Sequence, residues 1–82
     1  MQLAPDLAVE IVTPGDRPGE LLAKVAQLLD AGSRLVWVID PSRVHAVVYR
    51  PNGDMMIVGA DDHLDGEDVL PGFRSAIVDI FE

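Results

Sequence analysis

The chain has 82 residues and no cysteine, and 14 acidic residues against 6 Lys plus Arg give it a formal net charge of −8. This length supports one small domain with a marginal core, and the lack of cysteine excludes disulfides and thiolate metal sites. The acidity argues against binding nucleic acid through a basic surface, although it does not exclude an enzyme whose acids hold metal ions.

The same composition gives expectations about location and partners. No apolar run is long enough to cross a membrane, and a reducing cytosol fits a chain without cysteine, so we expect a cytoplasmic protein with no membrane contact. A small core without disulfides needs other support. We therefore expect either a homo-oligomer or a missing N-terminal half that completes the domain.

The first predicted element is a buried strand over residues 7–12, Leu-Ala-Val-Glu-Ile-Val, with Glu10 as its only charged residue. Thr13-Pro14-Gly15 breaks the strand, and Asp16 is predicted to cap a helix. Leucine, valine and alanine recur at helical spacing up to about Asp30, and Gly32 is predicted to end the helix in a left-handed conformation.

Residues 34–39 predict a second buried strand, Arg-Leu-Val-Trp-Val-Ile. Two apolar strands around one amphipathic helix indicate a parallel βαβ unit. Residues 44–50 and 55–58 predict two further strands, and Asn52-Gly53 between them is a hairpin signal. In residues 44–50, even-numbered positions are expected on one face and odd-numbered positions on the other.

The last part of the chain is expected to be irregular over residues 60–68 and to close with a short helix or an edge segment over residues 75–81. The predicted fold class is α/β (α+β), with a mixed sheet made of a βαβ unit followed by an antiparallel hairpin. We expect a single domain over residues 1–82.

Glu10 is the main functional candidate, because a lone carboxylate in an apolar strand is costly to bury unless something pairs with it. In a strand–loop–helix unit, ligands gather at the carboxyl end of the strand, near Glu10. With Asp6 and Lys24 it would suit metal-assisted phosphodiester hydrolysis, in which acids hold a hard cation and a lysine offsets developing charge. Asp6 is the weaker member, because four strand residues separate it from Glu10 by roughly 13 Å.

Each of these residues also has a simpler interpretation. Glu10 can lie at the solvent-exposed end of its strand and accept hydrogen bonds from nearby backbone N–H groups. Lys24 can form an ion pair with Glu20 one helical turn earlier, which contributes only a few tenths of a kcal/mol.

Two other groups are weaker candidates. Asp61-Asp62-His63-Leu64-Asp65 combines histidine and aspartate, which suit zinc or manganese, but a solvated acidic loop is favoured. Three aromatic rings, Trp37, His45 and Tyr49, are of a type that stacks on bases, but core and edge packing is favoured because few basic residues lie among them.

Several segments together resemble the Uma-two family of putative restriction endonucleases. They are residues 5–16 (Pro-Asp-Leu-Ala-Val-Glu-Ile-Val-Thr-Pro-Gly-Asp), 22–25 (Leu-Ala-Lys-Val), 31–41 (Ala-Gly-Ser-Arg-Leu-Val-Trp-Val-Ile-Asp-Pro), 48–53 (Val-Tyr-Arg-Pro-Asn-Gly) and 70–73 (Leu-Pro-Gly-Phe). The resemblance covers nearly the whole chain, and the order of the segments is more specific than any one of them.

The resemblance implies a PD-(D/E)xK nuclease fold, a mixed sheet with helices on both faces and a magnesium-dependent site. It places the family's acid on Glu10 and puts Val12 where the lysine of the motif would stand. The lysine role then moves to Lys24 on the following helix, and the carbonyl of Ile11 completes the metal shell.

The family pattern also includes an earlier strand with a metal-binding aspartate in an Arg-Pro-Asp element, which this sequence lacks. The resemblance therefore implies a truncated chain that corresponds to the C-terminal half of such a nuclease, with Asp6 as an auxiliary ligand at most.

The leading hypothesis is DNA cleavage with Mg²⁺ or Mn²⁺, in which Glu10 and Lys24 are catalytic and Glu10, Ile11 and Asp6 are the metal ligands. The alternative is a catalytically incomplete remnant that acts as an oligomerisation or interaction module through an exposed sheet edge. A third idea is a DNA mimic, based on the acidity alone.

Overall fold

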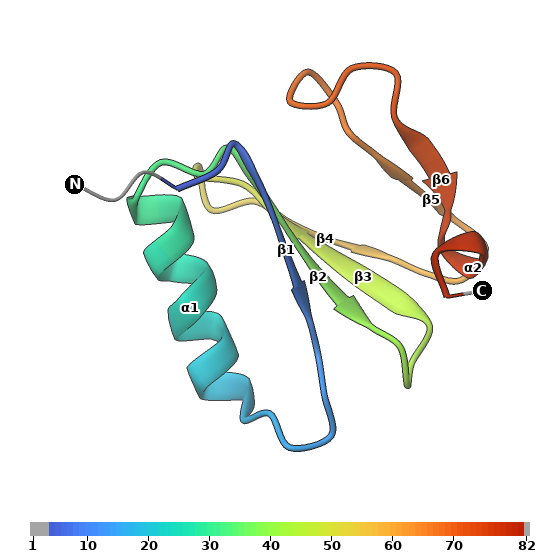
Figure 1. Cartoon of the computed structure of the whole chain (residues 1–82), viewed down its shortest axis with the longest axis horizontal. Coiled ribbons are helices and arrows are strands. Elements are labelled where there is room, and N and C mark those ends of the chain that lie inside the picture. Colours follow the sequence, from blue (N-terminus) through green and yellow to red (C-terminus); the bar gives the residue numbers. More distant parts are fainter. Residues whose placement is uncertain (1–3, 82) are drawn as a thin grey trace.

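A computed structural model describes residues 4–81 as a four-stranded sheet with a helix on one face and a hairpin on the other (Figure 1). The elements in chain order are β1 (Leu7–Ile11), α1 (Pro18–Asp30), β2 (Leu35–Asp40), β3 (His45–Tyr49), β4 (Met55–Val58), β5 (His63–Asp65), β6 (Arg74–Ala76) and α2 (Ile77–Ile80).

The main sheet has the strand order β1-β2-β3-β4. β1 and β2 are parallel, with Leu7 opposite Leu35 and Glu10 opposite Val38. β3 and β4 extend the sheet by antiparallel pairing, and Gly53 in the turn between them has a φ of 91°. The predicted βαβ unit followed by an Asn-Gly hairpin is therefore confirmed.

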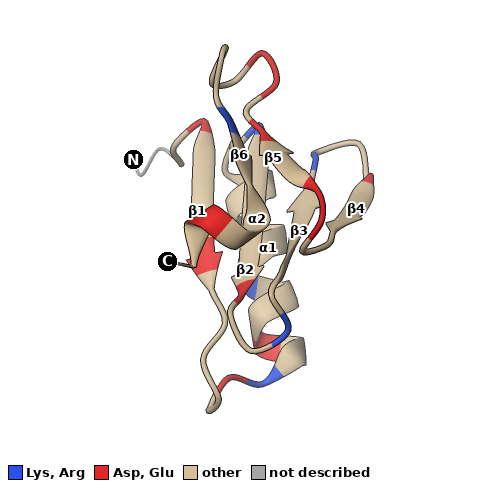
Figure 2. Cartoon of the chain, turned by 90° about the vertical axis from the view of Figure 1, so that its right-hand side faces the viewer, with Lys and Arg blue, Asp and Glu red and all other residues tan. Residues whose placement is uncertain are grey.

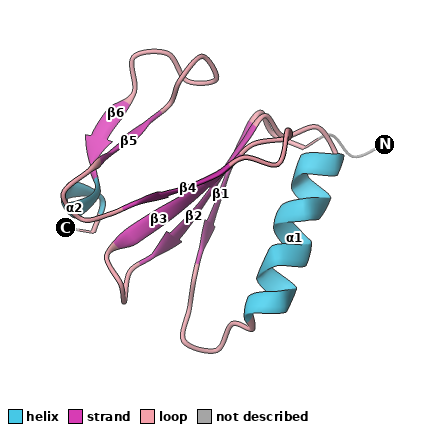
Figure 3. Ribbon diagram, turned by 180° about the vertical axis from the view of Figure 1, so that it is seen from behind, coloured by secondary structure: helices cyan, strands magenta, loops and turns pink. Residues whose placement is uncertain are grey.

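Side chains alternate between two cores on the two faces of this sheet. α1 lies on one face, and the β5–β6 hairpin lies on the other (Figure 3). The core under α1 consists of Ala8, Val25, Val36 and Val38. The opposite core contains Leu35, Trp37, Ile39, Ala46, Val48 and Val58, together with Leu64 and Ile77 from the C-terminal segment. The predicted alternation in β3 is confirmed, because Ala46 and Val48 belong to one core and Val47 and Tyr49 pack against the other.

The C-terminal segment corrects the prediction of an irregular stretch over residues 60–68. β5 lies within that stretch and pairs with β6, with Leu64 opposite Ser75. Leu64 is fully buried between two exposed neighbours, so it is the side chain of this short strand that packs against the main sheet. Residues 75–81 combine both predicted alternatives, because β6 passes directly into α2.

The start of α1 also differs from the prediction. Arg17 is the N-cap residue and provides no side-chain hydrogen bond, and the helix begins with Pro18. Asp16 instead accepts a hydrogen bond from the backbone N–H of Thr13, at 2.8 Å, and so closes the turn after β1. At the other end Gly32 has a φ of 116°, which confirms it as the residue that stops the helix.

β1 lies at the edge of the sheet. No described residue pairs with its outer edge, and Val9 and Ile11 are 48% and 59% exposed. These two side chains point to the face opposite α1, beyond the area that the hairpin covers. Ala8 and Glu10 point toward α1 instead.

Candidate functional site

Glu10 and Lys24 form an ion pair between β1 and α1. The Nζ atom of Lys24 lies 3.2 Å from Oε2 of Glu10. The Glu10 side chain is 22% exposed and that of Lys24 is 59% exposed. The carboxylate is thus partly withdrawn from water while its partner reaches over it from the solvent side.

The local folding of the chain explains this contact. Strand alternation places Glu10 on the same face as buried Ala8, beneath α1. On α1, Val25 is buried against this face, and Lys24 directly precedes it at the margin of the packed stripe. Lys24 is the only lysine in the chain, and it pairs across elements with Glu10. Within residues 4–81 no ion pair joins it to Glu20, so that simpler interpretation is wrong.

The carbonyl of Ile11 points toward the open edge of β1. In a parallel pair, backbone groups of alternate residues face the neighbouring strand. The Asp6 carbonyl accepts from Leu35 and the Val12 N–H donates to Ile39, so even-numbered residues of β1 face β2. Leu7, Val9 and Ile11 therefore direct their N–H and C=O groups outward, next to the Glu10 side chain.

Asp6 does not lie close to the Glu10–Lys24 ion pair. It is exposed and precedes the first residue of β1, whereas Glu10 is near the last. At strand spacing the two residues are roughly 13 Å apart. No group of three or more His, Asp or Glu residues in the described part of the chain could hold a metal ion. The described site therefore offers one carboxylate, one carbonyl and one ammonium group.

The acidic stretch around His63 consists of β5 with a turn on either side. The Asp62 carboxylate accepts a hydrogen bond from the N–H of Gly59 at 3.3 Å, and that of Asp65 accepts one from Glu67 at 2.7 Å. These bonds satisfy backbone donors at both ends of β5. The arrangement fits the simpler interpretation, in which these acids shape exposed loops.

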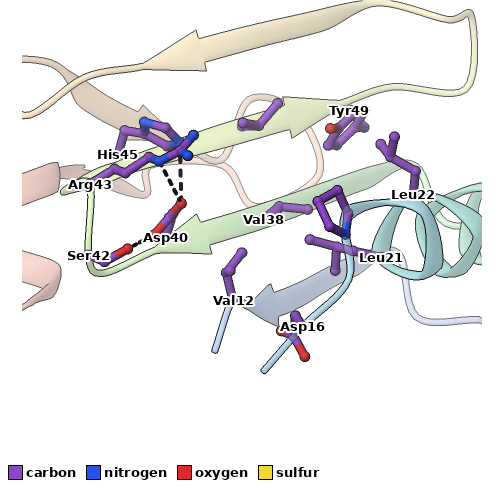
Figure 4. A pocket seen from close by; sticks show the side chains of 12 residues that line it. Val12, Asp16, Leu21, Leu22, Val38, Asp40, Ser42, Arg43, His45 and Tyr49 are labelled. Atoms are coloured by element: carbon purple, nitrogen blue, oxygen red, sulfur yellow. Dashed lines mark hydrogen bonds and ion pairs between the residues drawn. The ribbon is translucent and has the colours of Figure 1, made fainter. Parts of the chain in front are cut away.

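Trp37 is 5% exposed and packs against Phe73, with ring centroids 5.4 Å apart, so core packing is confirmed for this ring. His45 and Tyr49 are half-buried and line a pocket instead. The pocket has a volume of about 410 Å³ and lies between the first turns of α1 and strands β2 and β3 (Figure 4).

A polar cluster at one end of this pocket was not predicted from the sequence. Asp40 accepts a hydrogen bond from the Ser42 hydroxyl at 2.8 Å and lies 3.8 Å from Arg43 and 3.9 Å from His45. The Ser42 hydrogen bond lowers the pKa of Asp40, with smaller contributions from the Arg43 backbone N–H and from the charges of His45 and Arg43; partial burial opposes them. The available signal was an acid at the end of an apolar strand, as for Glu10.

A second ion pair joins the β3–β4 turn to the β5–β6 hairpin. The Nε atom of Arg50 donates to Oε1 of Glu67 at 3.1 Å, and its Nη2 atom donates to Oε2. This bidentate contact raises the pKa of Arg50 above its ordinary value. Glu67 has a φ of 55°, so a turn residue is held in an unusual conformation at this contact.

Charges of both signs are scattered over the elements, and the side of the molecule in Figure 2 shows no continuous basic face. Within residues 4–81 no helix has the length and apolar character needed to cross a membrane. The Glu10–Lys24 pair at an open strand edge therefore remains the strongest functional candidate.

Comparisons with known proteins match the chain to a family profile and to solved structures. The profile of the Uma2 family, described as "putative restriction endonuclease", matches residues 1–78. The crystal structure of a putative nuclease belonging to DUF820 from Anabaena variabilis superposes with a TM-score of 0.87 at 25% sequence identity. That match covers 98% of this chain and 45% of the Anabaena chain, so this chain spans less than half of that protein. No curated protein matches the chain.

Proposed function

The chain belongs to the Uma2 family of putative restriction endonucleases, and from this premise we propose that it carries the Glu10–Lys24 part of a metal-dependent site that cleaves DNA. The main support for this proposal is the 3.2 Å contact between Lys24, the only lysine, and Glu10, the one carboxylate of β1. The pair lies beside the open edge of the sheet, where a phosphodiester backbone has access.

The available donors fit Mg²⁺ or Mn²⁺. Both ions prefer oxygen ligands, and Mg²⁺ is commonly held by one or two carboxylates while it keeps several waters. Glu10 would provide the carboxylate and Ile11 the carbonyl oxygen. When bound, such an ion lowers the pKa of a water and offsets negative charge on the phosphate.

Lys24 would position and stabilise the phosphate. Its side chain is 59% exposed, so the ammonium group is free to turn from Glu10 toward an incoming phosphate oxygen. An ammonium group near the developing negative charge stabilises the transition state more than the ground state. Glu10, whose negative charge Lys24 balances in the free protein, would then hold the cation.

We expect a residue other than Glu10, Ile11 and Lys24 to provide a second carboxylate ligand for the metal ion. Asp6 would act as an auxiliary ligand only if the chain bent at Pro5-Asp6. The outward groups of Leu7, Val9 and Ile11 would instead pair with a further strand from another segment or chain. Such a strand would bring new side chains next to Glu10.

Cleavage of a supercoiled plasmid with Mg²⁺ or Mn²⁺ tests the proposal. We expect any nicking by the wild-type chain to be lost in Glu10→Gln and in Lys24→Ala. Glu20→Gln and Arg17→Ala are matched controls, because each removes one charge from exposed positions near the start of α1.

Metal binding provides a second readout, independent of turnover. Mn²⁺ should broaden the amide NMR signals around Glu10 and Ile11 in the wild type and in Lys24→Ala, but not in Glu10→Gln. A folded wild-type chain that neither cuts DNA nor shows this broadening would contradict the proposal.

A further inference from the structure

The outer edge of β4 combines open backbone groups with exposed apolar side chains. Met55, Met56 and Ile57 are 57%, 47% and 60% exposed, and β4 contains no charged residue. Edge strands of soluble sheets are normally protected by charges, proline or bulges. β1, the other edge, contains the charged residue Glu10, whereas β4 contains neither a charged residue nor a proline within the strand.

The hydrogen-bonding pattern identifies which groups of β4 are open. The Arg50 N–H donates to the Asp54 carbonyl at 3.0 Å, so even-numbered residues of β4 face β3. The N–H and C=O groups of Met55 and Ile57 therefore point outward. The side chains of these two residues share the α1 face of the sheet, opposite Tyr49 and Val47.

We propose that β4 is a self-association edge, on which β4 of a second copy of this chain pairs antiparallel about a two-fold axis between the two Met56 residues. In this register Met55 lies opposite Ile57 of the second copy, and Ile57 lies opposite Met55 of the second copy. Both are hydrogen-bonded positions, so all outward N–H and C=O groups of Met55 and Ile57 find partners in both chains. This inference does not depend on the proposed cleavage.

The same register keeps like charges apart. Asp54 would lie opposite Val58 of the second copy, and the two Asp54 residues would be separated by about 13 Å along the strands. Apolar side chains would meet on both faces, Met55 with Ile57 on one and Met56 with Met56 on the other. Met56 also lines a groove of about 360 Å³ beside the β5–β6 hairpin, which gives the opposing methionine space to pack.

The product is one continuous sheet through both chains, with both α1 helices on the same face and both hairpins on the other. β4 has only 4 residues, so the interface is small and belongs to the weak, concentration-dependent class. We expect dimers at concentrations on the order of 100 µM and monomers well below that.

Single cysteines test the register directly, because the natural chain contains none. The axis places the two copies of residue 56 at a non-hydrogen-bonded pair with Cα atoms about 4.5 Å apart, within disulfide range. Met56→Cys should form a covalent dimer under mild oxidation. Met55→Cys is the matched control, since its two copies would be more than about 7 Å apart, too far for a disulfide.

Sedimentation tests the association without covalent chemistry. Ile57→Lys places a charge at the shared edge on an already exposed side chain, so we expect a folded monomer at all concentrations. Val9→Lys, on the exposed face of β1, should leave the dimer unchanged. A wild-type chain that stays monomeric near 100 µM would overturn the proposal. A dimer in which Met55→Cys cross-links as well as Met56→Cys would also overturn it.

Discussion

Glu10 and Lys24 contact each other at the sheet surface and contribute little to folding. Exposed or half-exposed ion pairs typically contribute about 0–1 kcal/mol, because water screens the charges and ordering the side chains costs entropy. The core beneath them consists of Ala8, Val25, Val36 and Val38 and does not depend on either charge. The pair therefore provides chemistry at the surface of a separately stabilised scaffold.

Lys24→Ala should consequently lower the free energy of unfolding by less than about 1 kcal/mol, as measured by urea denaturation. Loss of DNA cleavage in this variant would then reflect lost chemistry. Val25→Ala, the neighbouring buried position, is the comparison and should cost more, since it removes methyl groups from the core. A larger loss for Lys24→Ala than for Val25→Ala would contradict this division of roles.

Asp40 gives a pH-dependent contribution to stability. Its folded-state pKa is below the ordinary value of 3.8, mainly because of the Ser42 hydroxyl. A lowered carboxyl pKa stabilises the folded state above the unfolded-state pKa, and this stabilisation is lost as the pH falls through the folded-state pKa. We expect Asp40→Asn to reduce stability at neutral pH and to make little difference in strong acid.

Urea midpoints of wild type and Asp40→Asn at neutral pH and near pH 2 would measure this effect. Ser42→Ala should reproduce part of it, because it removes the first cause of the shift. If the urea midpoints of wild type and Asp40→Asn differ by the same amount at both pH values, the titration of Asp40 is not coupled to folding.

For single residues, the sequence predicted the role of some site residues better than that of others. Glu10 was identifiable because a single carboxylate interrupts an apolar strand, and that signal needs no tertiary information. The role of Lys24 came from the family resemblance, since helical spacing alone favoured a pair with Glu20. Asp40 was missed because its partners, Ser42, Arg43 and His45, come together only when the β2–β3 turn closes.

At the scale of elements, α1 begins without a side-chain cap. Arg17 occupies the N-cap position with extended backbone, φ −99° and ψ 128°, and makes no capping hydrogen bond. A positive side chain there also opposes the helix dipole. Asp16 is used for the preceding turn and cannot compensate.

Arg17→Ser should therefore stabilise the protein by about 0.5–1 kcal/mol, because serine provides the missing acceptor for the first helical N–H groups. Thermal or urea unfolding would detect the gain. Arg17→Ala separates the two causes, since it removes the charge without adding a cap, and a gain as large in alanine as in serine would show that charge alone is responsible.

The predicted elements were those with strong local patterns. α1 and the four strands of the main sheet have either helical apolar spacing or runs of β-branched residues, and their bounds were close to those observed. β5 and β6 have 3 residues each, and β5 has a single apolar side chain, so local sequence contains too little periodicity to identify them. Their strand character depends on contact with the main sheet, through Leu64.

At the scale of the whole molecule, one sheet separates two cores, and the C-terminal segment completes only one of them. Leu64 and Ile77 are fully buried against Trp37 and its neighbours. The parallel β1–β2 pair and α1 form the other core without help from residues 60–81. Stability of an 82-residue domain therefore depends strongly on whether the hairpin stays attached.

Leu64→Ala should lower the free energy of unfolding by about 2–5 kcal/mol, which is a large part of the total stability of a small domain. Amide hydrogen exchange should show loss of protection first in β5 and β6. Met56→Ala removes a side chain of similar size from an exposed position and should change stability far less. Equal losses in the two variants would contradict the attachment role of Leu64.

The contact between Trp37 and Phe73 gives the chain an internal optical probe. Trp37 is the only tryptophan, it lies on the hairpin side of the sheet, and its indole N–H has no hydrogen-bond partner within the described residues. Its fluorescence should be blue-shifted in the folded protein and should move to the red when the hairpin detaches and admits water. Loosening of α1, on the opposite face, should leave the emission almost unchanged. Emission wavelength and helical circular dichroism would thus follow the two faces of the sheet separately, without any added label.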